Sequence, residues 1–184
     1  TDQDSYKILA DILPKDSYVY SSHLTRTIKT MDATIKEGFK YKEYCLDKNF
    51  GEQNLGEWQG LKYEKLQEIT KEIDVFHPTW LCNPDYTPPG GESYNNLYNR
   101  VTSGIENIIK TRKEGDIVIF SHGGPIKAAI AHAIKADPNY TLPFWIDNLA
   151  VSRFDFLGNV CRVRFINLLP KIIYNSKNVY EGFI

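Results

Sequence analysis

Apolar residues recur at helical spacing in five parts of the chain. They predict helices over residues 1–13, 24–36, 63–73, 93–113 and 125–134. Pro14 and Gly38 supply the signals that end the first two helices. The fourth helix has the clearest amphipathic stripe, because one of its faces is lined by Leu97, Val101, Ile105, Ile108 and Ile109.

Short apolar runs predict strands over residues 18–20, 42–46 and 116–120, the last of them compact and buried. Residues 151–157 and 160–168 flank Gly158-Asn159, which predicts a closing hairpin. Helices that alternate with short apolar strands favour a three-layer α/β/α sandwich with a mixed, mostly parallel sheet. We expect one domain over residues 1–184, with a C-terminal tail from about residue 170.

The composition fits one folded domain, since 42% of the 184 residues are hydrophobic and 24% are charged. The net charge of −1 argues against a nucleic-acid-binding protein. No apolar run reaches the length of a membrane span and no signal peptide is recognised, so a cytoplasmic location without membrane contact is predicted. Cys45, Cys82 and Cys161 lack zinc or redox spacing and are predicted to be reduced thiols.

His122 is the strongest candidate for chemistry. The strand over residues 116–120 delivers it to a carboxyl end, the edge where α/β sheets bind ligands. Gly123 and Gly124 allow close approach of the backbone, and the helix that follows has an N-terminus suited to an anion. A loop histidine beside a helix cap explains this segment equally well.

Glu92 and Arg26 are weaker candidates when each is considered by itself. Glu92 follows Pro88-Pro-Gly-Gly91 and opens a helix, so simple capping is the favoured reading. As a general acid it would need burial or a bound phosphate to favour its protonated form. Arg26 follows a predicted strand by about one helical turn, where it is either a solvated charge or a bidentate phosphate ligand. His23 is expected at the surface or in a cap.

Several other catalytic motifs do not occur in the sequence. Gly-x-Ser-x-Gly, the phosphate-binding loop of nucleotide hydrolases, His-Glu-x-x-His and the EF-hand pattern are all missing. His77 and His132 have no neighbouring residues with metal-ligand spacing. Both histidines are therefore predicted to be structural.

Four segments in chain order resemble the histidine phosphatase (phosphoglycerate mutase-like) superfamily. They read Ser21-Ser-x-x-x-Arg26-Thr-x-x-Thr30, Phe50-Gly-Glu-x-x-Leu-Gly56-Glu-Trp-Gln-Gly60, Pro89-Gly-Gly-Glu92-Ser93 and Ser121-His122-Gly-Gly124. The likeness extends from Thr1 to about Leu168. It implies a phosphomonoester hydrolase that acts through a phosphohistidine.

The resemblance also implies a role for each matching residue. Arg26 and His122 would hold the phosphoryl oxygens, with the backbone N–H of Gly123 facing the same group. Glu92 would protonate the leaving oxygen and then deprotonate water. No metal or other cofactor is implied, and the partner would be a small phosphorylated substrate or inorganic phosphate.

The sequence departs from the family at the nucleophile, because Arg-His-Gly does not occur in it. The family places that motif at the end of a first strand, just before the first helix. His23, His77 and His132 do not match the position, so the 184-residue chain is predicted to be inactive by itself. Either the natural protein has this segment, or the chain is an inactive remnant that binds anions. Without that strand, exposed sheet edges predict a homodimer.

The choice between phosphatase and mutase rests on two segments. Gly56-Glu-Trp-Gln-Gly60 resembles the phosphatase-leaning branches, and the loop over residues 74–91 is short for a mutase lid. A phosphoglycerate mutase is the alternative. Sugar phosphates, nucleotide fragments and phosphoproteins all remain open as substrates.

Overall fold

The fold is described from a computed structural model, in which residues 3–112, 114–158 and 160–175 are placed. Its strands form two groups. β1 (Ser17–Ser21) lies between β2 (Tyr41–Leu46) and β3 (Ile117–Phe120), and all three are parallel. β4 (Val151–Leu157) and β5 (Val160–Leu168) form an antiparallel hairpin.

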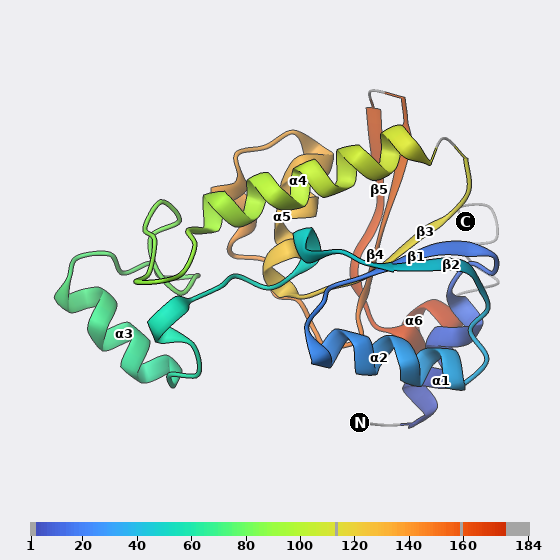
Figure 1. Cartoon of the computed structure of the whole chain (residues 1–184), viewed down its shortest axis with the longest axis horizontal. Helices are drawn as coiled ribbons and strands as arrows, with labels where there is room; N and C mark the ends of the chain where they lie inside the picture. Colours follow the sequence, from blue (N-terminus) through green and yellow to red (C-terminus); the bar gives the residue numbers. More distant parts are fainter. Residues whose placement is uncertain (1–2, 113, 159, 176–184) are drawn as a thin grey trace.

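Helices cover both faces of the strands (Figure 1). One side carries α1 (Gln3–Ile12), α2 (Thr25–Lys36) and α6 (Pro170–Asn175). The opposite side carries α4 (Tyr94–Thr111) and α5 (Gly123–Ile134). None of the described helices combines the length and the apolar character needed to cross a lipid bilayer.

Two hydrophobic clusters, one on each face of the parallel strands, define the layers. On the α1 and α2 side, the cluster contains Leu9, Met31, Val19, Val118 and Phe120. On the α4 and α5 side, Tyr20 and Ile117 pack against a cluster built from Phe50, Leu97, Val101, Ile105 and Ala128. Side chains of successive strand residues point to opposite faces, so one short strand contributes residues to both clusters. The predicted α/β fold class is confirmed.

A smaller cluster supports the segment that projects from the body at the left of Figure 1. There α3 (Tyr63–Glu72) packs through Leu66 against Leu55, Trp58 and Cys82. Three short 3-10 turns complete the elements, at Lys48–Phe50, Gly56–Trp58 and Pro138–Thr141. All three cysteines are free thiols.

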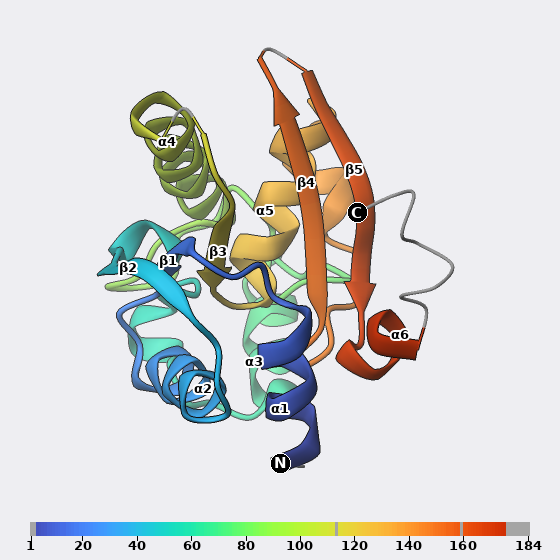
Figure 2. The ribbon, with the colours of Figure 1, turned by 90° about the vertical axis from the view of Figure 1, so that its right-hand side faces the viewer.

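The two strand groups are not joined by backbone hydrogen bonds among the described residues. β3 pairs only with β1, and β4 pairs only with β5, so each has a free edge. In Figure 2 the groups stand side by side with β3 and β4 as their nearest members, and Val151 packs against the cluster around Val118. Ile119 of β3 is 36% exposed. The strand that the sequence predicts as buried is thus buried through Val118 and Phe120 and partly exposed on its other face.

Several predicted boundaries shift by a few residues. Ser93 caps α4, where its hydroxyl accepts from the Asn96 N–H at 3.1 Å. Residues 170–175, predicted as the start of a tail, instead form α6, because Pro170 suits a first helical turn and Ile173 is buried. Thr1 at the start of the first predicted helix, the turn residue Asn159 and the tail beyond residue 175 lie outside the described residues.

Candidate active site

The carboxyl ends of β1 and β3 bring Ser22 and His122 together. The strands are parallel neighbours with Ser21 opposite Phe120, and the Ser22 N–H donates to the Phe120 carbonyl at 2.9 Å. His122 lies at the junction of β3 and α5, and its Nε2 is 2.9 Å from the Ser22 hydroxyl. The ring is buried, with 8% exposure. His122 therefore sits at the sheet edge that the sequence predicts.

Arg26 reaches the same histidine from the first turn of α2. Its Nε donates to His122 Nδ1 at 3.0 Å, across 96 residues of sequence. Because Nδ1 accepts this bond, the proton of a neutral ring lies on Nε2, which then donates to Ser22. The start of α2 is held against the same serine, since the Thr27 hydroxyl donates to the Ser22 carbonyl at 3.1 Å.

The electrostatic environment of His122 is positive. Burial is the largest cause that lowers the pKa of its imidazole to about 4, followed by the charges of Arg26, His23 and Arg100. The ring is therefore neutral at pH 7, beside the guanidinium of Arg26, whose charge favours an anionic ligand. Among the described residues, the two terminal nitrogens of Arg26 have no hydrogen-bond partner.

Glu92 is fixed where two backbone segments run side by side. The Glu92 N–H donates to the Asn54 carbonyl at 2.8 Å, and the Glu57 N–H donates to the Pro89 carbonyl at 2.9 Å. Gly56 permits this approach, because a Cβ there would lie 2.0 Å from the Pro89 carbonyl oxygen and its φ is +55°. The Asn54 N–H also donates to Glu92 Oε1 at 2.9 Å, which orients the carboxylate.

Arg100, which the sequence analysis does not identify, binds the Glu92 carboxylate from α4. Its Nε donates to Oε2 at 2.9 Å and a terminal nitrogen donates to Oε1 at 2.6 Å. Both carboxylate oxygens thus accept from N–H donors, an arrangement that suits the ionised form. Arg100 follows Glu92 by eight residues, and no periodic pattern in the sequence indicates the pair.

Glu52 and Gln53 connect the surroundings of Glu92 to the helix that follows His122. The Glu52 carboxylate accepts from the N–H of Gln53 at 3.0 Å and of Gly124 at 3.3 Å. The Gln53 amide donates to the Glu92 carbonyl at 2.9 Å. Arg26 and His122 are thus in direct contact, whereas Glu92 is joined to the helix after His122 through this loop.

The first turn of α5 faces a protein carboxylate. Glu52 lies against the N-terminal amides, where the helix dipole favours negative charge. The expected contact between the Gly123 N–H and a phosphate stays a prediction. Glu52 occurs in the second segment that resembles the family, so that segment, read together with the helix start, is the signal that could have found it.

A buried lysine is connected to the backbone of Glu92 through Trp80 and Gln53. Lys127 of α5 donates to the Leu142 carbonyl at 2.7 Å, and its Nζ lies 4.3 Å from the centre of the Trp80 ring. Burial lowers the pKa of this ammonium to about 8. The Trp80 indole N–H donates to the Gln53 amide oxygen at 2.9 Å, and Gln53 is only 3% exposed. This buried chain of contacts ends at the Glu92 backbone.

Gly124→Ala is expected to lower the free energy of unfolding by about 1–3 kcal/mol. A Cβ at this position would lie 2.3 Å from Glu52 Oε1 and 3.2 Å from a methyl group of Leu97. The carboxylate is held by two amides, so it cannot move without losing hydrogen bonds. Urea unfolding monitored by circular dichroism measures the change.

Gly123→Ala is the matched control, because the nearest atom to a Cβ there is Glu52 Oε2 at 4.0 Å. We expect a change within about 0.5 kcal/mol for this variant. Equal losses in the two variants would show that the first turn of α5 is unlike the one described.

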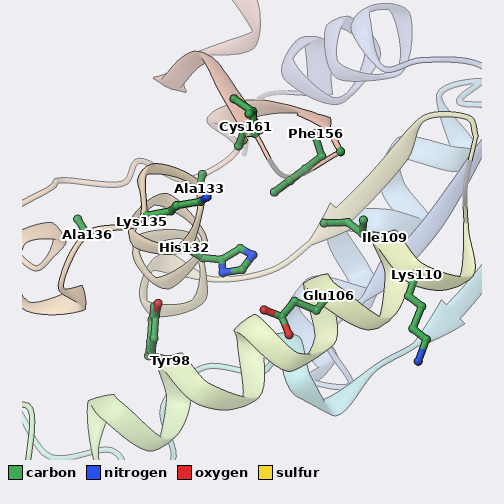
Figure 3. A pocket seen from close by; sticks show the side chains of 12 residues that line it. Tyr98, Glu106, Ile109, Lys110, His132, Ala133, Lys135, Ala136, Phe156 and Cys161 are labelled. Atoms are coloured by element: carbon green, nitrogen blue, oxygen red, sulfur yellow. The ribbon is translucent and has the colours of Figure 1, made fainter.

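The other histidines lie apart from the Arg26–His122 contact or at its margin. His132 lines a pocket of about 680 Å³ between α4, α5 and the hairpin, together with Tyr98 and Phe156 (Figure 3). It is ten residues beyond His122 on α5, or roughly 15 Å along the axis. His23 is exposed and lies between β1 and α2, and His77 lies in the connection that follows α3. Among the described residues, no group of three or more potential ligands could hold a metal ion.

Known proteins resemble this chain in sequence and in fold. Phosphoglycerate mutase-like protein 4 of Arabidopsis thaliana is 34% identical over 119 residues, which cover 65% of this chain and 51% of that protein. Phosphoserine phosphatase 1 of Hydrogenobacter thermophilus is 30% identical over 149 residues, which cover 79% and 68% respectively. Other curated relatives are longer still, and this chain spans 34% of one from Mycobacterium tuberculosis.

A solved structure shares the fold at low sequence identity. Mycobacterial glucosyl-3-phosphoglycerate phosphatase Rv2419c, in complex with inorganic phosphate, superposes with a TM-score of 0.73 at 19% identity. The likeness covers 92% of this chain and 86% of that one. The model of the histidine phosphatase superfamily (branch 1) matches residues 7–169. With most of its length covered by that match, the chain belongs to the histidine phosphatase superfamily, branch 1.

Proposed function

We propose that Arg26 and His122 bind the phosphoryl group of a small phosphomonoester, as part of a phosphohistidine-dependent phosphatase. The observation that carries the proposal is the contact between Arg26 Nε and His122 Nδ1 at the carboxyl end of β1 and β3. It places the terminal nitrogens of a guanidinium beside a buried imidazole. Such donors match the oxygens of a phosphoryl group.

The proposed reaction has two steps. A histidine nitrogen attacks phosphorus, and the bond to the ester oxygen breaks with its electron pair on that oxygen, which takes a proton from Glu92. In the second step a water oxygen attacks phosphorus while Glu92 accepts a water proton. The N–P bond then breaks, its electron pair returns to the histidine, and phosphate leaves. Arg26 offsets the charge of the phosphoryl oxygens throughout, and His122 offers them a hydrogen-bond donor.

The acid role requires Glu92 to change partners or protonation state. In this structure its oxygens accept from Arg100 and Asn54, which suits the ionised form. A phosphoryl dianion close to the carboxylate would disfavour that charge and attract a proton. The proposal therefore has the bound substrate, and not the free protein, create the protonated acid.

The nucleophile would come from a strand placed between β3 and β4. Among the described residues no second histidine is hydrogen-bonded to His122 or Arg26, and the free edges of β3 and β4 face one another in Figure 2. A strand paired with β3 would end at the same sheet edge as His122. That position suits the Arg-His-Gly segment implied by the family resemblance.

The substrate class follows from what the relatives share in their names. Phosphoserine and glucosyl-3-phosphoglycerate are both monoesters of small hydroxyl compounds, and the second relative was solved with phosphate bound. A mutase remains the alternative because one relative is named as phosphoglycerate mutase-like. The Gly56–Gly60 segment and the short connection from α3 to α4 favour hydrolysis.

Formation of an acid-labile phosphoenzyme tests the proposal. We expect the 184-residue chain to form none, and to hydrolyse an aryl phosphate little or not at all. The product that also includes the in-frame upstream coding sequence should form one, provided that this sequence encodes Arg-His-Gly. Radiolabelled phosphoryl transfer, quenched at alkaline and at acid pH, provides the measurement.

Two outcomes would contradict parts of this proposal. A phosphoenzyme on the 184-residue chain would reveal a nucleophile within it, and His23→Ala would then be the first variant to examine. An upstream sequence without Arg-His-Gly would favour the remnant that binds anions without turnover. Light scattering of the same samples tests the proposed homodimer, which the free edges of β3 and β4 favour only for the shorter chain.

A further inference from the structure

Arg100 makes more polar contacts than a single ion pair requires. Besides its two bonds to Glu92, its terminal nitrogens donate to carbonyls of the preceding loop: Lys48 at 3.4 Å, Asn49 at 2.7 Å, Gly51 at 2.8 Å and Glu52 at 3.2 Å. The side chains of Arg100 and Glu92 are 22% and 19% exposed. The guanidinium thus uses its whole fork of N–H groups inside the protein.

The loop that Arg100 holds is also attached to the end of β3 and the start of α5. The Phe50 carbonyl accepts from the Ser121 hydroxyl at 2.8 Å, next to His122. The Glu52 carboxylate accepts from the Gly124 N–H on the other side of His122. One guanidinium therefore contacts both the Glu92 carboxylate and the backbone loop that flanks the phosphoryl-binding histidine.

We propose that Arg100 is a positioning residue that fixes the Glu92 carboxylate relative to His122. This inference rests on the proposed function, in which Glu92 transfers the proton. Arg100 contacts no reacting atom in the proposed reaction, and it acts through Glu92 and the loop over residues 49–52. Lysine cannot replace it, because an ammonium offers three donors without the planar fork that spans a carboxylate.

Arg100→Lys separates this role from a general structural one. For a phosphomonoester with a poor leaving group, we expect kcat of the phosphoenzyme-forming protein to fall by about 100-fold, the lower range for a positioned proton donor. For an aryl phosphate with a good leaving group, we expect a loss of no more than about threefold, since that oxygen needs no proton. Affinity for inorganic phosphate at Arg26 and His122 should stay within about threefold.

Amide hydrogen exchange gives a readout that does not depend on activity. The Asn54 N–H donates to Glu92 Oε1, so a carboxylate that is no longer fixed leaves this amide less protected. We expect its exchange to become at least about tenfold faster in Arg100→Lys. The control is Arg112→Lys, which alters an ion pair between Arg112 and Glu43 elsewhere on the molecule. Asn54 exchange should not change in that control.

The outcomes separate the inference from the proposed function. Unchanged Asn54 exchange, or equal losses of kcat on both substrates, would overturn the role of Arg100. If even the wild-type protein hydrolyses neither substrate, the proposed function fails, and the exchange measurement still decides whether Arg100 fixes Glu92. Should Arg100→Lys fail to fold, Arg100→Gln keeps an amide donor for the carboxylate and is judged by the same two readouts.

Discussion

Glu92→Gln is expected to lower kcat of the phosphoenzyme-forming protein by about 100- to 10,000-fold on substrates with poor leaving groups. Glutamine keeps the shape of the side chain and can still accept from the Asn54 N–H, which lies 2.9 Å from Oε1. It cannot deliver a proton to the departing oxygen. The good leaving group of an aryl phosphate departs without that proton. For this substrate, the rate of the first step should therefore fall much less.

The measurement is a series of phosphomonoesters that span leaving-group basicity, assayed by release of inorganic phosphate. The slope of log kcat against leaving-group basicity should become steeper in the variant. Glu106→Gln is the control, because Glu106 is an exposed glutamate on the same helix as Arg100. Equal losses on good and poor leaving groups would remove Glu92 from the acid role.

His122→Ala is expected to abolish measurable phosphate binding as well as turnover. The variant removes a donor to the phosphoryl group and also the ring that receives Arg26 Nε. A hydrogen bond to a charged group contributes about 1.5–3 kcal/mol, which corresponds to roughly 10- to 150-fold in affinity. Without the imidazole, the Arg26 side chain also loses the contact that orients it.

Sulfate adds a pH readout, because its charge stays constant from neutral pH down to about 4. Burial, followed by the charges of Arg26, His23 and Arg100, lowers the pKa of His122 to about 4 in the free protein. A bound dianion offsets these cations and raises that pKa, so sulfate should bind more tightly as the pH falls from neutrality towards 4.

Isothermal titration of sulfate and phosphate into the wild-type chain and its variants measures both effects. His122→Ala should lose the affinity and its pH dependence together. His132→Ala, on the same helix but in the separate pocket of Figure 3, should bind like the wild type. Retained binding in His122→Ala would remove this residue from the phosphoryl site.

Most elements of the fold could be predicted from local patterns. The helices α1 to α5 and all five strands occur close to their predicted positions. For the helices, the reason is that burial of one face imposes a period on the sequence. The partial exposure of β3 could not be predicted, since an apolar run does not reveal whether a neighbouring strand covers its edge. Helix α6 was also missed, because six residues make fewer than two turns and are too few to show a period.

The sequence indicated candidate site residues where a segment combined with a position in the fold. His122 follows a strand and Arg26 begins a helix, and both features are local. Arg100 and Lys127 were not found, because each acts through partners distant in sequence. A guanidinium that binds backbone carbonyls of residues 48–52 leaves no sequence signal, since every residue has a carbonyl.

The sequence by itself determined the periodicity of the elements, the α/β class and the residue types suited to a phosphoryl group. Only the tertiary structure decided that Arg26 meets His122 at 3.0 Å, and that Arg100 joins Glu92 to the loop beside that histidine. The physical reason is that periodicity records which side chains are buried. A site depends on which strand ends and loops meet, and backbone hydrogen bonds and burial of the whole chain fix that arrangement.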